Sequence, residues 1–320
     1  MTGNRANAAS VQSARAEASE VIESTLAQIN SVVLGKEDRV KLAVTCLLAG
    51  GHLLIEDLPG TGKTVLAHAL AKTFGLDFQR LQFTNDLLPA DIVGASIFDR
   101  NTNQFHFHQG PVFTQILLAD EINRASPKAQ SGLLEVMEER QVSVDGKTYA
   151  LPVPFFVVAT QNPLEQSGTA RLPDSQLDRF MMCIDMGYPG REPELEILAS
   201  ADKRTTIAAL SATLSAESLV TLQRQAAEIT ASPALLSYLR DLLEVTRQND
   251  DYLIGLSTRA GLALLQAARA WALLEQETQV LPSHIQAVLP YVAGHRLAGN
   301  RNAGRRLEVG HQVLNAVPVF

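Results

Sequence analysis

Residues 57–64 read DLPGTGKT, and this run constrains the 320-residue chain more than any other feature, because it separates an apolar stretch from a segment of helical character. The apolar run 53–55 before it is expected to form a buried parallel strand. Gly60 and Gly62 allow backbone N–H groups to approach an anion, and a helix that begins near Lys63 directs the positive end of its dipole toward the same point. The run therefore predicts a phosphate-binding loop between a strand and a helix.

The side chains of this loop predict ATP and Mg²⁺ as its ligands. Lys63 is expected to reach the β- and γ-phosphates and the Thr64 hydroxyl to bind Mg²⁺, and Pro59 and Thr61 are counted with the glycines as ATP-binding residues. One position departs from the pattern GxxxxGK[ST], since Asp57 stands where the first Gly is expected, and the effect of this change stays open. The alternative is a glycine-rich turn that happens to precede Lys-Thr.

The second motif is an acid pair, Asp120 and Glu121, which directly follows the apolar run at residues 116–119. A strand tipped by two acids presents one carboxylate to the outer shell of Mg²⁺ and a neighbouring one to a water that attacks the γ-phosphate. Asp120 is therefore assigned to the metal, through a water, and Glu121 to the general base. Acids at a strand end also occur in solvated turns, and it is the phosphate loop that favours the catalytic interpretation.

A third motif is the apolar run 155–160, which has strand character and ends in Gln161-Asn162-Pro163. An amide at the tip of a strand beside the acid-tipped one is suited to orient the attacking water and to sense the γ-phosphate. Asn before Pro is also ordinary turn chemistry, because the residue before a proline is pushed out of the helical region. Together with the first two motifs, Asn162 is assigned the sensing role.

Strand and helix signals alternate along the first part of the chain, as a doubly wound parallel sheet requires. Strands are expected near 53–56, 78–83, 115–119, 155–160 and 181–185. After Tyr188 the composition is rich in Ala and Leu and has no strand signal, so a helical domain is expected to follow. The predicted fold class is α/β, a P-loop doubly wound parallel sheet with a C-terminal all-α lid domain.

The predicted organisation has five parts. In chain order they are a flexible tail at 1–20, the nucleotide-binding core at 21–190, a linker at 191–212, the lid at 213–300 and a C-terminal segment at 301–320. The core is expected to contain two hairpin insertions, near 95–108 and near 140–152. Asp145-Gly146 is a hairpin turn signal in the second of them.

The first insertion alternates aromatic and polar side chains, as a hairpin does. Phe105 and Phe107 fall on one face, and His106 and His108 fall on the other. No third ligand lies near the two histidines in the sequence, so they are expected to be exposed strand residues rather than metal ligands.

The composition of the chain limits the kinds of protein that it can be. A chain with 46% hydrophobic and 19% charged residues can bury one large core and a smaller one, and the net charge of −7 argues against a mainly electrostatic hold on nucleic acid. Cys46 and Cys183 both stand in apolar surroundings, so buried free thiols are expected. No segment approaches the roughly 20 apolar residues of a membrane span, and a cytoplasmic location is the expectation.

The stretches ADEINRASPKAQSGLLEVMEERQVSVDG and QFTNDLLPADIVG, at residues 119–146 and 82–94, resemble the MoxR family of AAA+ ATPases, of the helix-2-insert type. The resemblance extends from about Val32 to the C-terminus. It implies an AAA+ core with a helical lid, and it places Val33 and Gly35 in the segment that surrounds the adenine. The two hairpins resemble the helix-2 insert and the hairpin before the sensing asparagine, which project toward the pore or the axial face of a ring.

The resemblance also assigns two arginines. Arg179, in the run LDRF, matches the arginine finger that acts on the γ-phosphate of a neighbouring subunit, with Arg171 and Arg124 as alternatives. Arg259 matches the lid arginine called sensor 2, although Thr258 replaces the proline often found there. Arg179 on a solvated face and Arg259 as a plain helix-start charge are the structural alternatives.

The function implied by the resemblance is an ATP-hydrolysing ring that remodels a client protein. Similar proteins form hexamers, work with a partner that carries a von Willebrand factor A domain, and help to mature enzymes or insert their cofactors. A nucleic-acid motor, a small-molecule kinase and a nucleotide-gated scaffold without turnover are the competing classes. The net negative charge disfavours the nucleic-acid motor, and the acid pair with the lid arginine disfavours the kinase. The complete set of motifs disfavours a scaffold without turnover.

Overall fold

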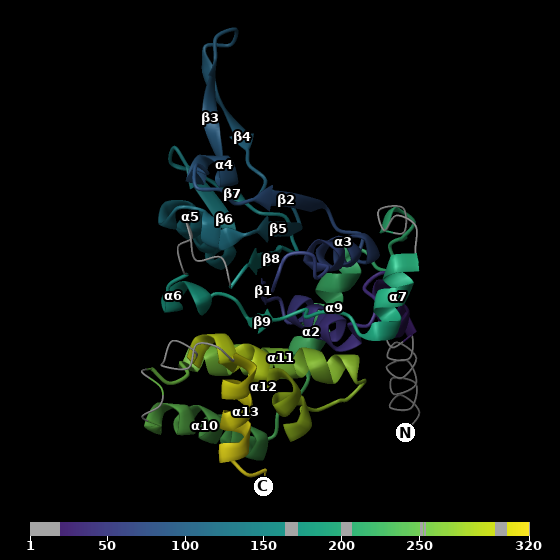
Figure 1. Ribbon diagram of the computed structural model, residues 1–320. Coiled ribbons are helices and arrows are strands. Elements are labelled where there is room, and N and C mark those ends of the chain that lie inside the picture. Colours follow the sequence, from purple (N-terminus) through teal and green to yellow (C-terminus); the bar gives the residue numbers. More distant parts are fainter. Residues whose placement is uncertain are drawn as a thin grey trace, which may run out of the picture.

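The computed structural model describes residues 20–163, 172–199, 207–249, 252, 254–297 and 306–319 (Figure 1). A strand-containing core forms the upper part of the view, and a group of helices from the C-terminal third of the chain lies beneath it. The predicted α/β class with a helical lid is confirmed.

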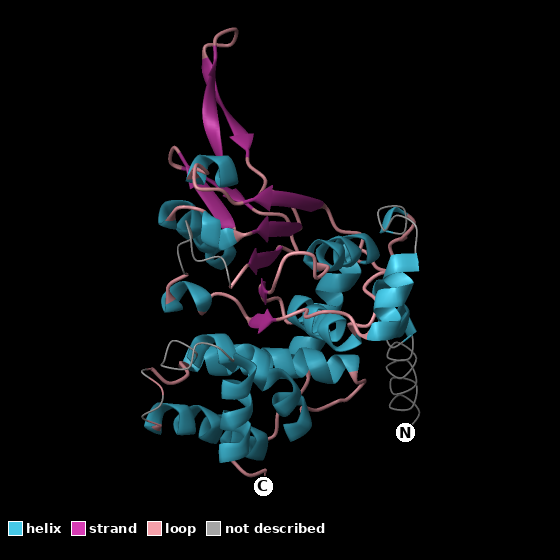
Figure 2. Ribbon diagram, viewed as in Figure 1, coloured by secondary structure: helices cyan, strands magenta, loops and turns pink. Residues whose placement is uncertain are grey.

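Five parallel strands form the central sheet, with the strands surrounded by helices (Figure 2). In spatial order they are β2 (Phe78–Gln82), β5 (Ile116–Asp120), β8 (Phe156–Gln161), β1 (Leu53–Glu56) and β9 (Met182–Ile184). All four pairings between neighbours are parallel, so every strand ends at the same edge. The predicted strand positions are confirmed to within two residues, and the three motifs of the sequence analysis therefore meet at one edge of the sheet.

Alternation along β1 shows how the two hydrophobic cores arise. Leu53 and Ile55 belong to one buried cluster and Leu54 to another, because successive side chains of a strand point to opposite faces. The helices α2 (Glu37–Leu48) and α3 (Lys63–Thr73) contribute to the first cluster, and α5 (Pro127–Glu139) to the second. Cys46 and Cys183 are buried and free, as expected, and burial raises the pKa of both thiols.

Two antiparallel hairpins and two short helices extend from the central sheet and its surrounding helices. The first hairpin, β3 (Gly94–Asp99) and β4 (Gln104–Gln109), follows α4 (Pro89–Val93) and projects from the top of Figure 1. The second consists of β6 (Gln141–Val144) and β7 (Lys147–Ala150), and the Tyr149 ring stacks on Phe107 at 4.3 Å, which ties the hairpins together. A 3-10 turn, η1 (Ile122–Arg124), precedes α5, and α6 (Asp174–Leu177) precedes β9.

The lid contains α9 (Ala216–Glu228), α10 (Pro233–Gln248), α11 (Thr258–Leu274), α12 (Pro282–Leu297) and α13 (Arg306–Ala316). Ser215, Ser232 and Ser257 cap three of these helices, each by accepting the backbone N–H three residues later. α13 packs closely on α12, since a Cβ on Gly310 would lie 2.4 Å from the Pro290 Cα. The helical lid therefore continues beyond residue 300, into the stretch treated above as a separate C-terminal segment.

The expected linker at 191–212 is different in the structure. Its first part is a helix, α7 (Arg191–Ala199), and residues 200–206 lie outside the described residues. The expected tail at 1–20 lies outside them too, except for residue 20, which begins a helical segment that runs to residue 30. Within the described part of the chain, no helix is long and apolar enough to cross a membrane.

Candidate nucleotide-binding site

The predicted phosphate loop connects the end of β1 to the start of α3. Gly60 and Gly62 have φ angles of 84° and 95°, in the left-handed region that favours glycine, and a Cβ on either would meet no atom of the described residues within 4 Å. The backbone conformation is thus what demands glycine here, beside open space. α3 begins at Lys63 without a side-chain cap, so its first N–H groups have no side-chain acceptor and point at a site for an anion. Pro59 is exposed in the loop, and Thr64 is half-buried in the first turn of α3.

The Lys63 side chain lies back against its own loop. Its Nζ donates to the carbonyl oxygens of Asp57, at 2.8 Å, and Leu58, at 2.7 Å. Burial lowers the pKa of Lys63, and the carboxylates of Asp57, Asp120 and Glu121 act in the opposite direction. The acid pair is therefore close enough to the phosphate loop for its charge to act on the lysine.

Asp57 explains the departure from the usual loop pattern. Its Oδ2 accepts the N–H groups of Met186, at 2.8 Å, and Gly187, at 2.6 Å, while Oδ1 accepts the N–H of Leu58 at 2.7 Å. The Lys36 Nζ donates to the carbonyl oxygens of the same two residues, at 2.6 and 2.8 Å. A carboxylate in place of glycine thus ties the start of the phosphate loop to the segment that follows β9.

Asp120 and Glu121 stand at the end of β5. A hydroxyl from β8 holds both, because Thr160 Oγ1 donates to Asp120 Oδ1 at 2.6 Å and accepts the Glu121 N–H at 2.9 Å. Arg80, on β2, forms an ion pair with the other oxygen of Asp120. Glu121 has a φ of 56°, an uncommon conformation for a residue with a side chain, and such strain often marks a functional position.

Two further groups hold the Glu121 carboxylate. Oε2 accepts a hydrogen bond from Gln82 Nε2 at 2.7 Å and forms an ion pair with Arg124 Nη1 at 2.9 Å. Gln82 is in register with Asp120 in the parallel pair of β2 and β5, so its side chain is delivered to the acid pair by strand pairing. Sequence reasoning missed Thr160, Arg80 and Gln82. Thr160 and Gln82 lie at or next to the end of a strand, whereas Arg80 lies in the middle of β2 and had no such signal.

Asn162 follows directly after β8 at the same edge. β8 lies between β5 and β1, and Gln161 is in register with Glu56. Asn162 therefore lies between the acid pair and the phosphate loop, and its carbonyl oxygen accepts a weak hydrogen bond from Asn123 Nδ2 at 3.4 Å. This is the position from which an amide can reach a water beside the γ-phosphate.

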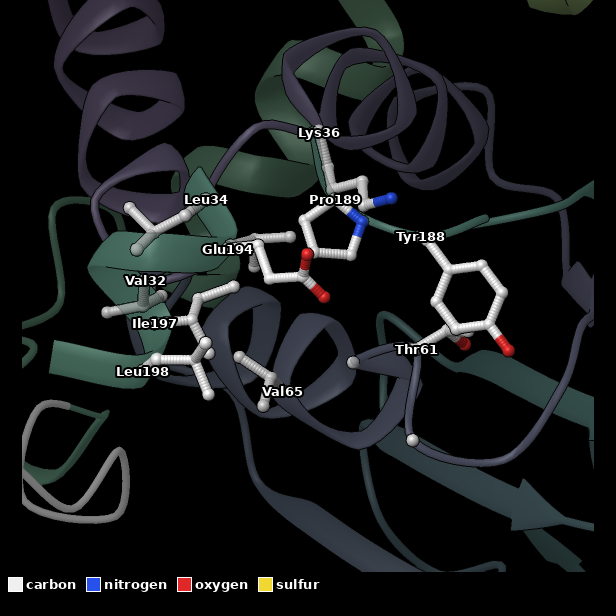
Figure 3. Close-up of a pocket in the computed structure, with 13 residues that line it drawn as sticks. Val32, Leu34, Lys36, Thr61, Val65, Tyr188, Pro189, Glu194, Ile197 and Leu198 are labelled. Carbon is white, nitrogen blue, oxygen red and sulfur yellow. The ribbon is translucent and has the colours of Figure 1, made fainter. Parts of the chain in front are cut away.

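A cavity of about 250 Å³ opens beside the phosphate loop (Figure 3). Gly60, Thr61 and Gly62 form one side, and Val33 lines the cavity together with its neighbours in the segment 32–36. Apolar side chains gather at one end of the cavity, where Val32, Val65, Ile197 and Leu198 lie. This end is suited to a purine ring and the end beside Thr61 to phosphates.

Gly35, which is expected in the same segment, is not among the residues that line the cavity. Its φ is 67° and a Cβ there would lie 2.6 Å from the Pro193 side chain, so glycine allows α7 to pack closely. α7 supplies Glu194, Ile197 and Leu198 to the cavity wall, and the Glu194 carboxylate points into the cavity in Figure 3. No sequence pattern indicated this wall of the cavity, which falls in the expected linker at 191–212.

Arg179 and Arg259 converge on one carboxylate. Arg179 Nη2 lies 3.1 Å from Glu138 Oε2, and Arg259 Nη2 lies 2.6 Å from Glu138 Oε1. Glu138 is in the last turn of α5, whereas Arg179 precedes β9 and Arg259 begins α11 in the lid. The two arginines singled out by the sequence therefore share a single partner that the sequence did not indicate.

This arginine pair lies at the opposite edge of the sheet from the phosphate loop. The C-terminal end of α5 contacts the residues that precede β1, since His52 Nε2 donates to the Met137 carbonyl at 3.2 Å and Arg140 Nη2 to the Gly50 carbonyl at 2.9 Å. The four residues of β1 then separate this edge from the loop by about 13 Å. Arg259 thus does not line the nucleotide cavity of its own chain. Arg124 is paired with Glu121, and Arg171 lies outside the described residues.

The open loop, the uncapped helix start and the adjacent acid pair fit a magnesium nucleotide, and they define a P-loop ATPase of the AAA+ class. Residues 52–182 match the family model for the ATPase family associated with various cellular activities (AAA), and residues 244–316 match the model for the AAA lid domain. Among the described residues, no group of three or more His, Cys, Asp or Glu is arranged to hold a metal ion by itself.

Relatives narrow the class to a family. The chain is 46% identical over 269 residues to the uncharacterized protein YeaC of Bacillus subtilis, with 84% of each chain covered. It is 39% identical to Chaperone MoxR1 of Mycobacterium tuberculosis, over 86% of this chain and 75% of that protein. A solved structure from Cytophaga hutchinsonii has a TM-score of 0.87 and 34% identity, over 98% of this chain and 99% of the other. The chain belongs to the MoxR family of AAA+ ATPases.

Proposed function

We propose that this protein hydrolyses ATP to ADP and phosphate in a ring of identical subunits, and that the ring remodels a client protein. The observation that carries the proposal is the separation of two sets of groups. The phosphate loop and the acid pair stand at one edge of the sheet, and the Arg179 and Arg259 pair stands at the other. A complete site then needs the edges of two adjacent subunits.

Within one subunit, each group has a distinct task. Lys63 leaves its two loop carbonyls for the β- and γ-phosphates, and Thr64 would hold Mg²⁺ together with Asp120, the latter through a water. The metal, when bound, neutralises charge that develops on the phosphate oxygens. Glu121 takes the proton of the attacking water, and Asn162 orients that water. Gln82 and Arg124 hold the Glu121 carboxylate until the nucleotide arrives.

The neighbouring subunit supplies the cations. Arg179 acts as the finger on the γ-phosphate, and Arg259 joins it from the lid because both lie on one carboxylate. An arginine supplied in this way stabilises the charge of the transition state. Arg259 is thus assigned to the nucleotide of the neighbour rather than to that of its own chain.

The remodelling role rests on relatives and on the resemblance. One relative, 39% identical, is called Chaperone MoxR1. We extend a chaperone-like role to this protein, in maturation or cofactor insertion of a client complex, with a hexamer as the assembly and a von Willebrand factor A domain protein as the partner. A nucleic-acid motor fits less well, since the net charge is −7.

Mixing two inactive variants tests the shared site. Glu121→Gln removes the base and keeps the arginines, whereas Arg179→Ala keeps the base and removes the finger. A mixture of the two proteins rebuilds intact sites, so ATP turnover returns at intermediate ratios. Light scattering with ATP and Mg²⁺ gives the ring size in parallel. No recovery at any ratio, in proteins that assemble, contradicts the proposal.

A further inference from the structure

The loop that carries Arg179 is held from the lid. This loop, residues 178–181, connects α6 to β9, and α12 of the lid packs against both of these elements. Arg296 lies in the last turn of α12, and its side chain is only 6% exposed. A guanidinium at that depth requires partners for its donors, because a buried, unpaired charge is strongly unfavourable.

Nearly all hydrogen-bond acceptors of the Arg296 side chain lie in the loop 178–181. Its Nε donates to Asp178 Oδ1 at 2.6 Å, its Nη2 to the carbonyl oxygens of Asp178 and Phe180 at 3.1 and 2.8 Å, and its Nη1 to the Met181 carbonyl at 3.1 Å. A further bond from Nη1 reaches the Val292 carbonyl on its own helix. One planar group therefore fixes backbone positions on both sides of Arg179.

His295 adds a second hold on the same backbone. Its Nε2 lies 3.1 Å from the Phe180 carbonyl oxygen, which accepts only, so this nitrogen carries the proton. Burial lowers the pKa of His295, and the imidazole is therefore neutral. Two consecutive residues at the end of α12 thus form hydrogen bonds to the loop 178–181. The Arg179 side chain itself is 30% exposed and points toward Glu138 on the surface.

We propose that Arg296 is a positioning residue, which sets Arg179 for the γ-phosphate of the neighbouring subunit and makes the orientation of the lid a determinant of finger placement. A planar five-donor group suits this task, because it binds one carboxylate and three loop carbonyls in a fixed geometry. A displacement of about 1 Å at a catalytic group is enough to lower a rate about 100-fold. The inference rests on the proposed shared site.

Arg296→Lys is the first test, since lysine keeps the charge and cannot span these acceptors. We expect kcat for ATP to fall about 10- to 100-fold and the KM to stay within about twofold, because the nucleotide cavity lies elsewhere. Asp178→Asn is the second variant, with the same expected result. Arg240→Lys is the matched control, because Arg240 is an exposed lid arginine that forms an ion pair with Glu244 on its own helix.

Subunit mixing separates positioning from a general structural defect. Arg296→Lys mixed with Glu121→Gln recovers turnover, because the second protein supplies a well-placed finger to the intact site of the first. Arg296→Lys mixed with Arg179→Ala stays inactive, since every finger in that ring is defective.

Several outcomes overturn the inference. Full activity of Arg296→Lys does so, and so does a raised KM or a failure to recover with Glu121→Gln while Arg179→Ala recovers in the parallel mixture. If both Arg296→Lys and Asp178→Asn fail to fold by circular dichroism, the contact serves the fold alone and the proposal is wrong. If Arg179→Ala also fails to recover with Glu121→Gln, the shared site itself is at fault.

Discussion

The two edges of the central sheet differ in how they hold their charged side chains. At the carboxyl edge, the phosphate loop is open, Lys63 rests on loop carbonyls and a cavity lies alongside. At the amino edge, Arg179 and Arg259 meet one carboxylate, and the loop between α6 and β9 is fixed by a buried guanidinium from the lid. One edge is built to receive a ligand and the other to present a rigid group. In the proposed function, the chemistry is divided between these two edges, which belong to adjacent subunits at each site.

Removing one positive charge from each edge is expected to have the largest effects and to separate nucleotide binding from turnover. Lys63→Ala is expected to abolish nucleotide binding, whereas Arg179→Ala is expected to leave binding intact and to lower kcat about 1000-fold or more. Equilibrium binding of a fluorescent ATP analogue and steady-state turnover measure the two effects. Weakened binding in Arg179→Ala would place that arginine in its own subunit's site.

His52 makes the amino edge sensitive to pH. Its ring is fully buried, with Nδ1 accepting the Val157 N–H at 3.0 Å and Nε2 donating to Met137, and burial lowers its pKa from 6.5 to about 4. Between about pH 6.5 and pH 4 this group is protonated in the unfolded chain and neutral in the folded chain, so the stability that it contributes is fully present above pH 6.5 and is lost as the pH falls toward 4.

His52 is expected to contribute about 3 kcal/mol to the loss in the free energy of unfolding between pH 7 and pH 4. Urea titration at a series of pH values measures it. His52→Gln flattens this part of the profile, and His106→Gln, at an exposed position on the hairpin, is the control that leaves it unchanged. Equal slopes in the wild type and His52→Gln would contradict the assignment.

Asp57 tests whether the carboxyl edge is as open as its loop suggests. The carboxylate holds three N–H groups, and Asn at this position turns an amide NH₂ group toward donors. We expect Asp57→Asn to raise the KM for ATP about tenfold with a smaller effect on kcat, because the segment after β9 is released and forms part of the cavity wall. Asp38→Asn, an exposed acid on α2, is the control for lost charge. An unchanged KM would mean that the loop keeps its shape without this carboxylate.

The features that could be predicted from the sequence are those that depend on a local pattern of residues. The strands of the sheet follow apolar runs, and the phosphate loop and acid pair follow the ends of those runs, so their meeting at one edge results from parallel pairing. α7 was missed because it buries none of its residues, and an exposed helix has no periodic apolar signal. Asp57 and Arg296 bind partners more than a hundred residues away in the sequence, and no local pattern records such pairs.

Glu138 gives the finest test, because it acts on both arginines without touching the nucleotide. Its carboxylate is 35% exposed, so solvent screens the two ion pairs and each contributes at most about 1 kcal/mol. Glu138→Gln leaves one acceptor oxygen for two guanidinium groups, which then spread over more orientations. We expect kcat to fall about two- to fivefold, with the KM unchanged and the difference from the wild type smaller at high salt. Glu139→Gln, the exposed neighbour in the same turn, is expected to have no effect. A rise in kcat would instead show that Glu138 competes with the phosphate of the neighbouring subunit, and the amino edge would then be restrained by this carboxylate rather than prepared by it.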